Sequence, residues 1–135
     1  MDGTSHTDAD VKNLKADSAL VPEEIRVAKD KKRLIVTFPG GARFDFAAEL
    51  LRVNSPSAEV QGHGPGQRVL VAGKRGVAIE GIESVGNYAI LIRFDDGHDT
   101  GIFSWRYLYE LGAKQDELWR DYEAALGNAG LKRDA

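Results

Sequence analysis

The chain has 135 residues, of which 42% are hydrophobic and 29% charged, with a net charge of -3 and no cysteine. This composition fits one compact domain that folds without metal, excludes disulfides and thiolate ligands, and argues against a nucleic-acid surface, which needs clustered basic residues. No apolar run approaches the roughly 20 residues of a membrane span, and no secretory signal is visible, so we expect a cytoplasmic protein.

The first part of the chain divides into a tail and the start of a sheet. Residues 1–21 hold few large apolar side chains, so we expect a flexible, dispensable tail followed by a folded domain over residues 22–131. A short helix is predicted over residues 47–53, and it ends before Pro56, which disfavours helix at the residue preceding it. Before this helix, alternating apolar residues predict strands at 24–29, 33–38 and 42–46.

The second part repeats strands and then ends in two helices. Ser104 is a suitable N-cap for a helix that Gly112 would end, and a last helix over residues 114–126 would end at Gly127. We expect Leu118 and Trp119 to be buried where this helix packs against the sheet, so that Trp119→Ala should cost roughly 3–5 kcal/mol. Strands are predicted at 68–72 and 77–85, which would form a hairpin, and at 88–94 and 98–103.

Two stretches share one plan. "LIVTFPGGARFDFAAELL" and "LIRFDDGHDTGIFSWRYL" both read as strand, glycine turn, strand and short helix. A constant offset aligns Phe38 with Phe94 and Phe46 with Ile102. We therefore predict a single α+β domain with a mostly antiparallel β-sheet, built from two β-β-α units and a C-terminal helix. A hairpin followed by a helix is also a common local motif, so the similarity is no proof of duplication.

The loop "NSPSAEVQGHGPGQ", residues 54–67, is the feature that most invites a function. Its glycines match neither the phosphate-binding loop, which needs Gly-Lys-Ser/Thr at a fixed spacing, nor the dinucleotide pattern, which leads into a helix. Its serines lack the Gly-x-Ser-x-Gly elbow of hydrolases. A backbone nest for an anion stays open as an alternative.

The stretches "LLRVNSPSAEVQGHGPGQ", "GIESVGNYAILIRFDDGHDTGIFSW" and "YLYELG" together resemble the gamma-butyrobetaine hydroxylase-like N-terminal domain family. The resemblance covers residues 21–131. It implies a domain that occurs alone in bacteria, at the front of two dioxygenases, and at the tail of some plastid iron-sulfur cluster carrier ATPases. The catalytic iron domain of the dioxygenases has no counterpart in this chain, so the resemblance does not transfer hydroxylase activity.

The same resemblance implies the place of a vanished zinc site. In the dioxygenases this domain holds zinc by three cysteines and a histidine, and these positions fall on Ser55, Ser57, Val60 and His98. Hydroxyls and a valine methyl cannot replace thiolates in a tetrahedral zinc site. We therefore expect a degenerate site without metal or other cofactor, in which His98 lies close enough to a serine for a hydrogen bond.

Three functions remain as hypotheses. The leading one is a non-enzymatic interaction domain with a protein partner, occurring as a monomer or weak homodimer, in a setting such as iron-sulfur cluster maturation. Its expected interaction surface combines His63, Gly64, His98 and Tyr107. The second is a metal-binding accessory protein that uses His63 and His98, although a histidine at a hairpin tip more often bonds local acceptors. The third is a small enzyme, for which no nucleophile–base pair stands out.

Overall fold

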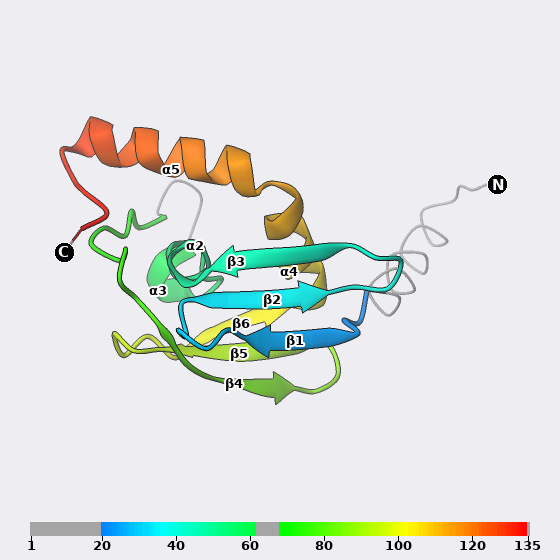
Figure 1. Ribbon diagram of the computed structural model, residues 1–135. Helices are drawn as coiled ribbons and strands as arrows, with labels where there is room; N and C mark the ends of the chain where they lie inside the picture. The colour runs from blue at the N-terminus through cyan, green and yellow to red at the C-terminus, as the bar shows by residue number, and fades with distance from the viewer. Residues whose placement is uncertain (1–19, 62–67, 135) are drawn as a thin grey trace, which may run out of the picture.

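The computed structural model describes residues 20–61 and 68–134, which form two three-stranded antiparallel sheets and four helices (Figure 1). The predicted α+β fold of antiparallel strands is confirmed, with two sheets in place of one. Most of the predicted 1–21 tail lies outside the described residues. In chain order the elements are β1 (Glu24–Val27), β2 (Arg33–Thr37), β3 (Arg43–Ala47), α2 (Ala48–Val53), α3 (Ala58–Gln61), β4 (Ile79–Val85), β5 (Ala89–Phe94), β6 (Gly101–Ser104), α4 (Trp105–Ala113) and α5 (Gln115–Ala129).

The first sheet has the order β1-β2-β3. Leu34 pairs with Phe46 across β2 and β3. Residues opposite each other on paired strands face the same side of the sheet, and here both face the core and are fully buried. Gly40 and Gly41, in the predicted turn between these strands, have φ values of 89° and 96°. Backbone in this left-handed region favours glycine, which explains the turn that the sequence predicts.

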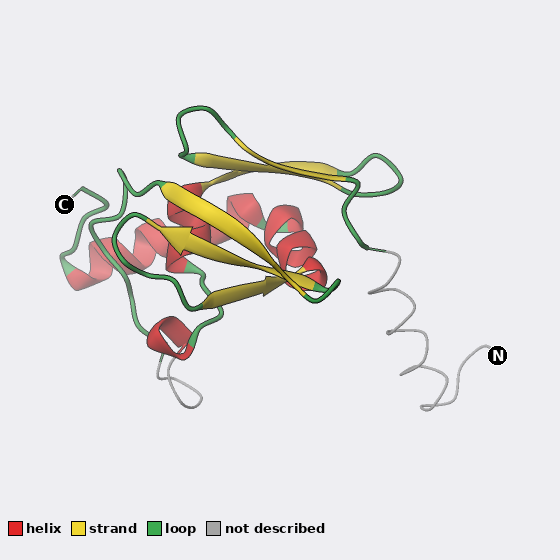
Figure 2. Ribbon diagram, turned by 90° about the horizontal axis from the view of Figure 1, so that it is seen from below, coloured by secondary structure: helices red, strands yellow, loops and turns green. Residues whose placement is uncertain are grey.

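The second sheet has the order β4-β5-β6, and in Figure 1 β5 and β6 overlap the first sheet while β4 is the lowest strand. Ile90 pairs with Phe103 across β5 and β6, and both face the core. The core lies between the two sheets and takes in α2 and α4, whose inward residues include Leu50, Leu51 and Leu108. Seen from below, the second sheet lies in front and the long helices lie behind it (Figure 2).

The two β-β-α units are present as β2-β3-α2 and β5-β6-α4. Phe38 and Phe94 are equivalent, since each amide donates to the carbonyl four residues later across its turn. The predicted match of Phe46 with Ile102 is wrong: Ile102 is exposed, and Phe103 takes the buried position opposite Ile90. The second unit therefore carries one extra residue between its turn and β6, where the loop bends inward at His98.

The predicted strand at 68–72 is absent, and so is the hairpin it would form with β4. Leu70, Val71 and Ala72 instead pack against a second small apolar cluster that includes Tyr122. The Tyr122 hydroxyl donates to the Val71 carbonyl at 2.6 Å. Side-chain packing and a hydroxyl thus hold this segment in place of a neighbouring strand.

The ends of the two long helices differ from prediction. α4 continues past Gly112, where any Cβ would overlap the Phe44 ring, so this glycine serves helix packing and does not end the helix. α5 ends at Ala129, with Gly130 in the left-handed conformation as its C-cap. Within the described residues, no helix is long and apolar enough to cross a membrane.

The chain beyond α5 folds back onto the domain. The amides of Gly73 and Arg75 donate to the carbonyls of Lys132 and Arg133, both at 3.0 Å. The Arg133 guanidinium lies 4.9 Å from the ring centroid of Trp119. Trp119 is only partly buried, whereas the sequence predicts that it is buried. We therefore expect truncation of Trp119 to cost less than the full-burial figure.

Candidate functional site

The serines of the glycine-rich loop lie directly after α2. The helix ends at Val53, and the side-chain amide of Asn54 donates to the Leu50 carbonyl at 2.9 Å, which turns the chain inward. Ser55 is fully buried and Ser57 is nearly so. Two hydroxyls thereby enter the protein interior, where they need hydrogen-bond partners.

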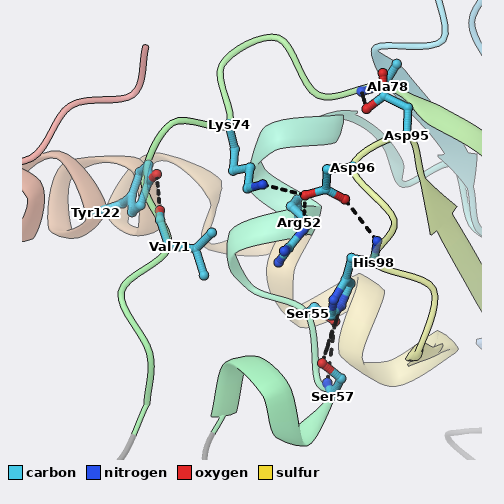
Figure 3. A network of polar contacts seen from close by, with 10 residues as sticks. All are labelled: Arg52, Ser55, Ser57, Val71, Lys74, Ala78, Asp95, Asp96, His98 and Tyr122. Carbon is cyan, nitrogen blue, oxygen red and sulfur yellow. Dashed lines mark hydrogen bonds and ion pairs between the residues drawn. The ribbon is translucent and has the colours of Figure 1, made fainter. Parts of the chain in front are cut away.

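Their common partner is His98 from the loop between β5 and β6 (Figure 3). Its Nε2 lies 2.8 Å from the Ser55 Oγ and 3.3 Å from the Ser57 Oγ, and the two hydroxyl oxygens lie 3.4 Å apart. Three polar side chains from segments about 40 residues apart thus form one cluster. The predicted hydrogen bond between His98 and the serines is confirmed.

Val60, the third position of the predicted degenerate site, is also buried. Its amide donates to the Ser57 carbonyl at 3.1 Å, and its own carbonyl accepts from the Val69 amide at 2.7 Å. Both bonds hold α3 beneath the serines. His63 and Gly64, named for the metal alternative and for the interaction surface, lie outside the described residues.

Two predicted contact residues prove to be internal. His98 is 6% exposed, so it is not an exposed hairpin-tip residue and has little surface to offer a partner. Tyr107 is partly buried, and its hydroxyl donates to the Asn54 carbonyl. Burial raises the Tyr107 pKa, because the phenolate would lose its solvation. Tyr107 therefore fixes the loop to α4 and is not a free contact residue.

Gly101 gives the cluster its space. A Cβ at this position would overlap the Ser55 hydroxyl and press against Phe103. The glycine is the first residue of β6, so the strand can pass directly over the serine. This packing reason could not be read from the sequence, where Gly101 resembles any other residue near a turn.

A charged network holds the His98 loop from the solvent side (Figure 3). The Asp96 carboxylate lies 2.7 Å from the Arg52 Nε and 2.7 Å from the Lys74 Nζ, and it accepts from the His98 amide at 3.1 Å. Burial opposes ionisation of Asp96, but these hydrogen bonds outweigh it and lower its pKa from 3.8 to about 2. Charge pairing therefore ties α2, the 73–76 turn and the His98 loop together.

Asp96 is expected to make the protein sensitive to acid. Its pKa is lower in the folded state, so its contribution is complete above pH 4 and is lost as the pH falls towards 2. A shift of this size corresponds to roughly 2 kcal/mol. Asp96→Asn should remove that contribution at pH 7 and flatten the pH dependence of the free energy of unfolding, measured in urea between pH 5 and 2.

The matched control is Asp45→Asn, because Asp45 forms an ion pair with Arg33 at the same 2.7 Å but in solvent. This variant should change stability by less than about 1 kcal/mol. Equal acid sensitivity in the Asp96→Asn variant and the parent protein would contradict the role assigned to Asp96.

The chemistry of the cluster fits neither zinc nor nucleophilic catalysis. Two neutral hydroxyls and one imidazole are a poor donor set for zinc, and the described residues contain no group of three His, Cys, Asp or Glu placed to hold a metal. The Ser55 hydroxyl touches a histidine, as in hydrolases, but it is closed from solvent. Asp96 contacts the backbone amide of His98, which is not the ring contact of a catalytic triad.

The fold and the cluster define a small α+β domain with two antiparallel sheets and a buried serine–histidine cluster between the end of α2 and the loop that precedes β6. A family model described as "Gamma-butyrobetaine hydroxylase-like, N-terminal" matches residues 25–109. The chain belongs to this family, as the motifs of its loop and second sheet indicated.

Solved structures agree with this assignment. Two proteins with NMR solution structures are 49% and 46% identical to the chain, with TM-scores of 0.74 and 0.71. The matches cover 84% and 83% of this chain and 90% and 83% of those chains. A crystal structure of a protein of unknown function from Acidithiobacillus ferrooxidans, in the DUF971 family, is 35% identical with a TM-score of 0.58, covering 70% of this chain and 96% of that one. Comparison with curated proteins found no match.

Proposed function

We propose that this protein is a non-enzymatic interaction domain that binds a protein partner through an apolar groove. The groove has a volume of about 320 Å³ and runs between α5 and the segment that follows the glycine-rich loop. Its lining residues are Val53, Asn54, Arg68, Val69, Leu70, Val71, Leu118, Asp121, Tyr122 and Ala125. This groove is the observation that carries the proposal.

The chemistry of the groove favours the apolar side chains of a protein segment. Its lining is mostly aliphatic and aromatic, and Val69 among the lining residues is 48% exposed, so the groove offers apolar surface to a partner. Arg68 and Asp121 place one charge of each sign on the lining. A partner segment with one or two large apolar side chains, flanked by charged residues, would match this arrangement.

A non-enzymatic role is supported by the burial of the serine and histidine side chains that could otherwise act in catalysis. The serine–histidine pair is closed from solvent, and Gly101 packs directly on the Ser55 hydroxyl. A substrate could reach that oxygen only if the surrounding chain moved. The cluster therefore supports the shape of the domain, with a hydrogen-bonded interior where the resembled enzymes hold a metal.

Iron-sulfur cluster maturation is the setting that we propose for the partner. The support is the resemblance to domains fused to cluster carrier ATPases, in which this domain works beside a second protein unit. In this protein we propose that the domain makes the same kind of contact with a second protein unit. The prediction is that the captured partner belongs to the machinery that assembles or carries clusters.

The experiment has two stages. The tagged full chain is used to capture partners from the native cell, and the dissociation constant of each purified candidate is then measured. Ala125→Glu places a charge in the groove and should weaken a true partner at least tenfold, whereas Glu24→Lys on the distant strand β1 should leave the affinity unchanged. Equal binding by the Ala125→Glu variant would show that the groove is not the interaction site.

A further inference from the structure

The outer face of the second sheet carries an apolar patch that neither core cluster includes. Val85, Leu91 and Ile102 point away from the core on adjacent strands, and Tyr88 lies beside them at the turn between β4 and β5; these four residues are the outer patch. Ile102 is 47% exposed and Tyr88 is 58% exposed. In Figure 2 this sheet lies in front and the helices lie behind it.

The first sheet shows what a solvated outer face looks like in this protein. Its outward positions are mostly charged, and Arg33 forms an ion pair with Asp45. The apolar residue at the centre of this face, Ile35, lies in register with Arg26 and Asp45 and is only 2% exposed. The outward charged residues are Glu24, Arg26, Arg33, Arg43 and Asp45. The second sheet has aliphatic residues on the outer face of all three strands, and Ile102 among them is 47% exposed. The first sheet therefore keeps its one outward aliphatic residue covered, whereas the second sheet leaves apolar surface open to a partner.

The charges beside the outer patch make it complementary to itself. Arg93 lies across Gly81, where a Cβ would overlap its guanidinium, and forms an ion pair with Glu83. One acid and one base thus lie side by side at the edge of an apolar centre. In a two-fold symmetric dimer the same surface of both copies forms the contact. Glu83 of one copy can therefore pair with Arg93 of the other, and Arg93 of the first with Glu83 of the second.

We propose that the outer patch binds a second copy of this chain and forms a weak, isologous dimer. β5 has six residues, so three strands present a face of roughly 20 Å by 14 Å. That area is well below the roughly 800 Å² per partner of a stable interface. The dimer therefore forms at high concentration and dissociates readily.

Sedimentation velocity of the full chain between about 10 µM and 1 mM tests the proposal. The parent protein should pass from monomer to dimer within this range. Ile102→Glu should raise the dissociation constant at least tenfold while leaving the circular dichroism spectrum unchanged. Val69→Glu, which charges the groove on another face, should leave dimerisation unchanged, and this control separates the dimer from the groove-bound partner.

A charge exchange gives a second, independent readout. Arg93→Glu places two acids together and should weaken the dimer, and the double exchange Arg93→Glu with Glu83→Arg should restore it. A parent protein that stays monomeric at 1 mM, whether its patch is solvated or covered by residues 1–19, overturns the proposal. A dimer that Ile102→Glu does not weaken overturns it as well, because the contact then uses another face.

Discussion

The triple substitution Ser55→Cys, Ser57→Cys and Val60→Cys is expected to create a protein that binds one zinc ion per chain. The donors are already close: the His98 Nε2 and the two serine oxygens lie 2.8 to 3.4 Å apart. Ligands around one zinc ion lie about 3 to 4 Å from one another, given bonds of ~2.0 to 2.3 Å. Sites of this kind bind zinc with roughly 10 kcal/mol or more at neutral pH.

Metal analysis after purification without an affinity tag checks the prediction, together with thermal unfolding with and without chelator. The triple variant should melt higher with zinc than without it, because metal that binds only the folded state stabilises that state. The same triple variant with His98→Gln is the matched control and should bind zinc more weakly. A folded triple variant without zinc would refute the placement of the vanished ligands.

Loss of the Arg133 side chain is expected to be among the most destabilising single changes outside the core. The Glu49 carboxylate is 4% exposed and receives two hydrogen bonds from the Arg133 guanidinium, at 2.7 and 2.9 Å. Arg133→Met leaves this carboxylate buried without its partner. Breaking a buried pair costs roughly 3–5 kcal/mol, and we expect about 3 because the Arg133 side chain is 27% exposed.

Urea unfolding at pH 7 measures this effect. The matched control is Arg75→Met, because Arg75 pairs with Asp134 in the same C-terminal segment but is 55% exposed, and it should cost less than about 1 kcal/mol. In the Arg133→Met background, Glu49→Gln should recover part of the loss, since an uncharged amide is easier to bury. Equal effects of Arg133→Met and Arg75→Met would show that the Glu49 pair contributes no more than a surface contact.

Much of the fold could be predicted from the sequence because its signals are local. The apolar residues of β2 and β5, the glycines of the β2–β3 turn and the Ser104 cap each act over a few residues, and the strands, the turn and the cap are present as predicted. The segment 68–72 is a case in which local sequence signals predict the wrong structure. Its apolar residues predict a strand, but the Tyr122 hydroxyl, 51 residues from its acceptor Val71, decides its conformation.

The candidate site divides in the same way. The motifs determined the family and, through it, the meeting of Ser55, Ser57 and His98. His98 and Tyr107 were predicted to contact a partner, but both are internal and hold the loop in place. The sequence by itself thus determined the strands, the turns and the family, because residue types and short spacings carry them. Only the tertiary structure decided the Asp96 network and the Arg133–Glu49 pair, because both join segments that are distant in sequence. It also decided the groove and the outer patch, because each depends on which faces the packed elements leave uncovered.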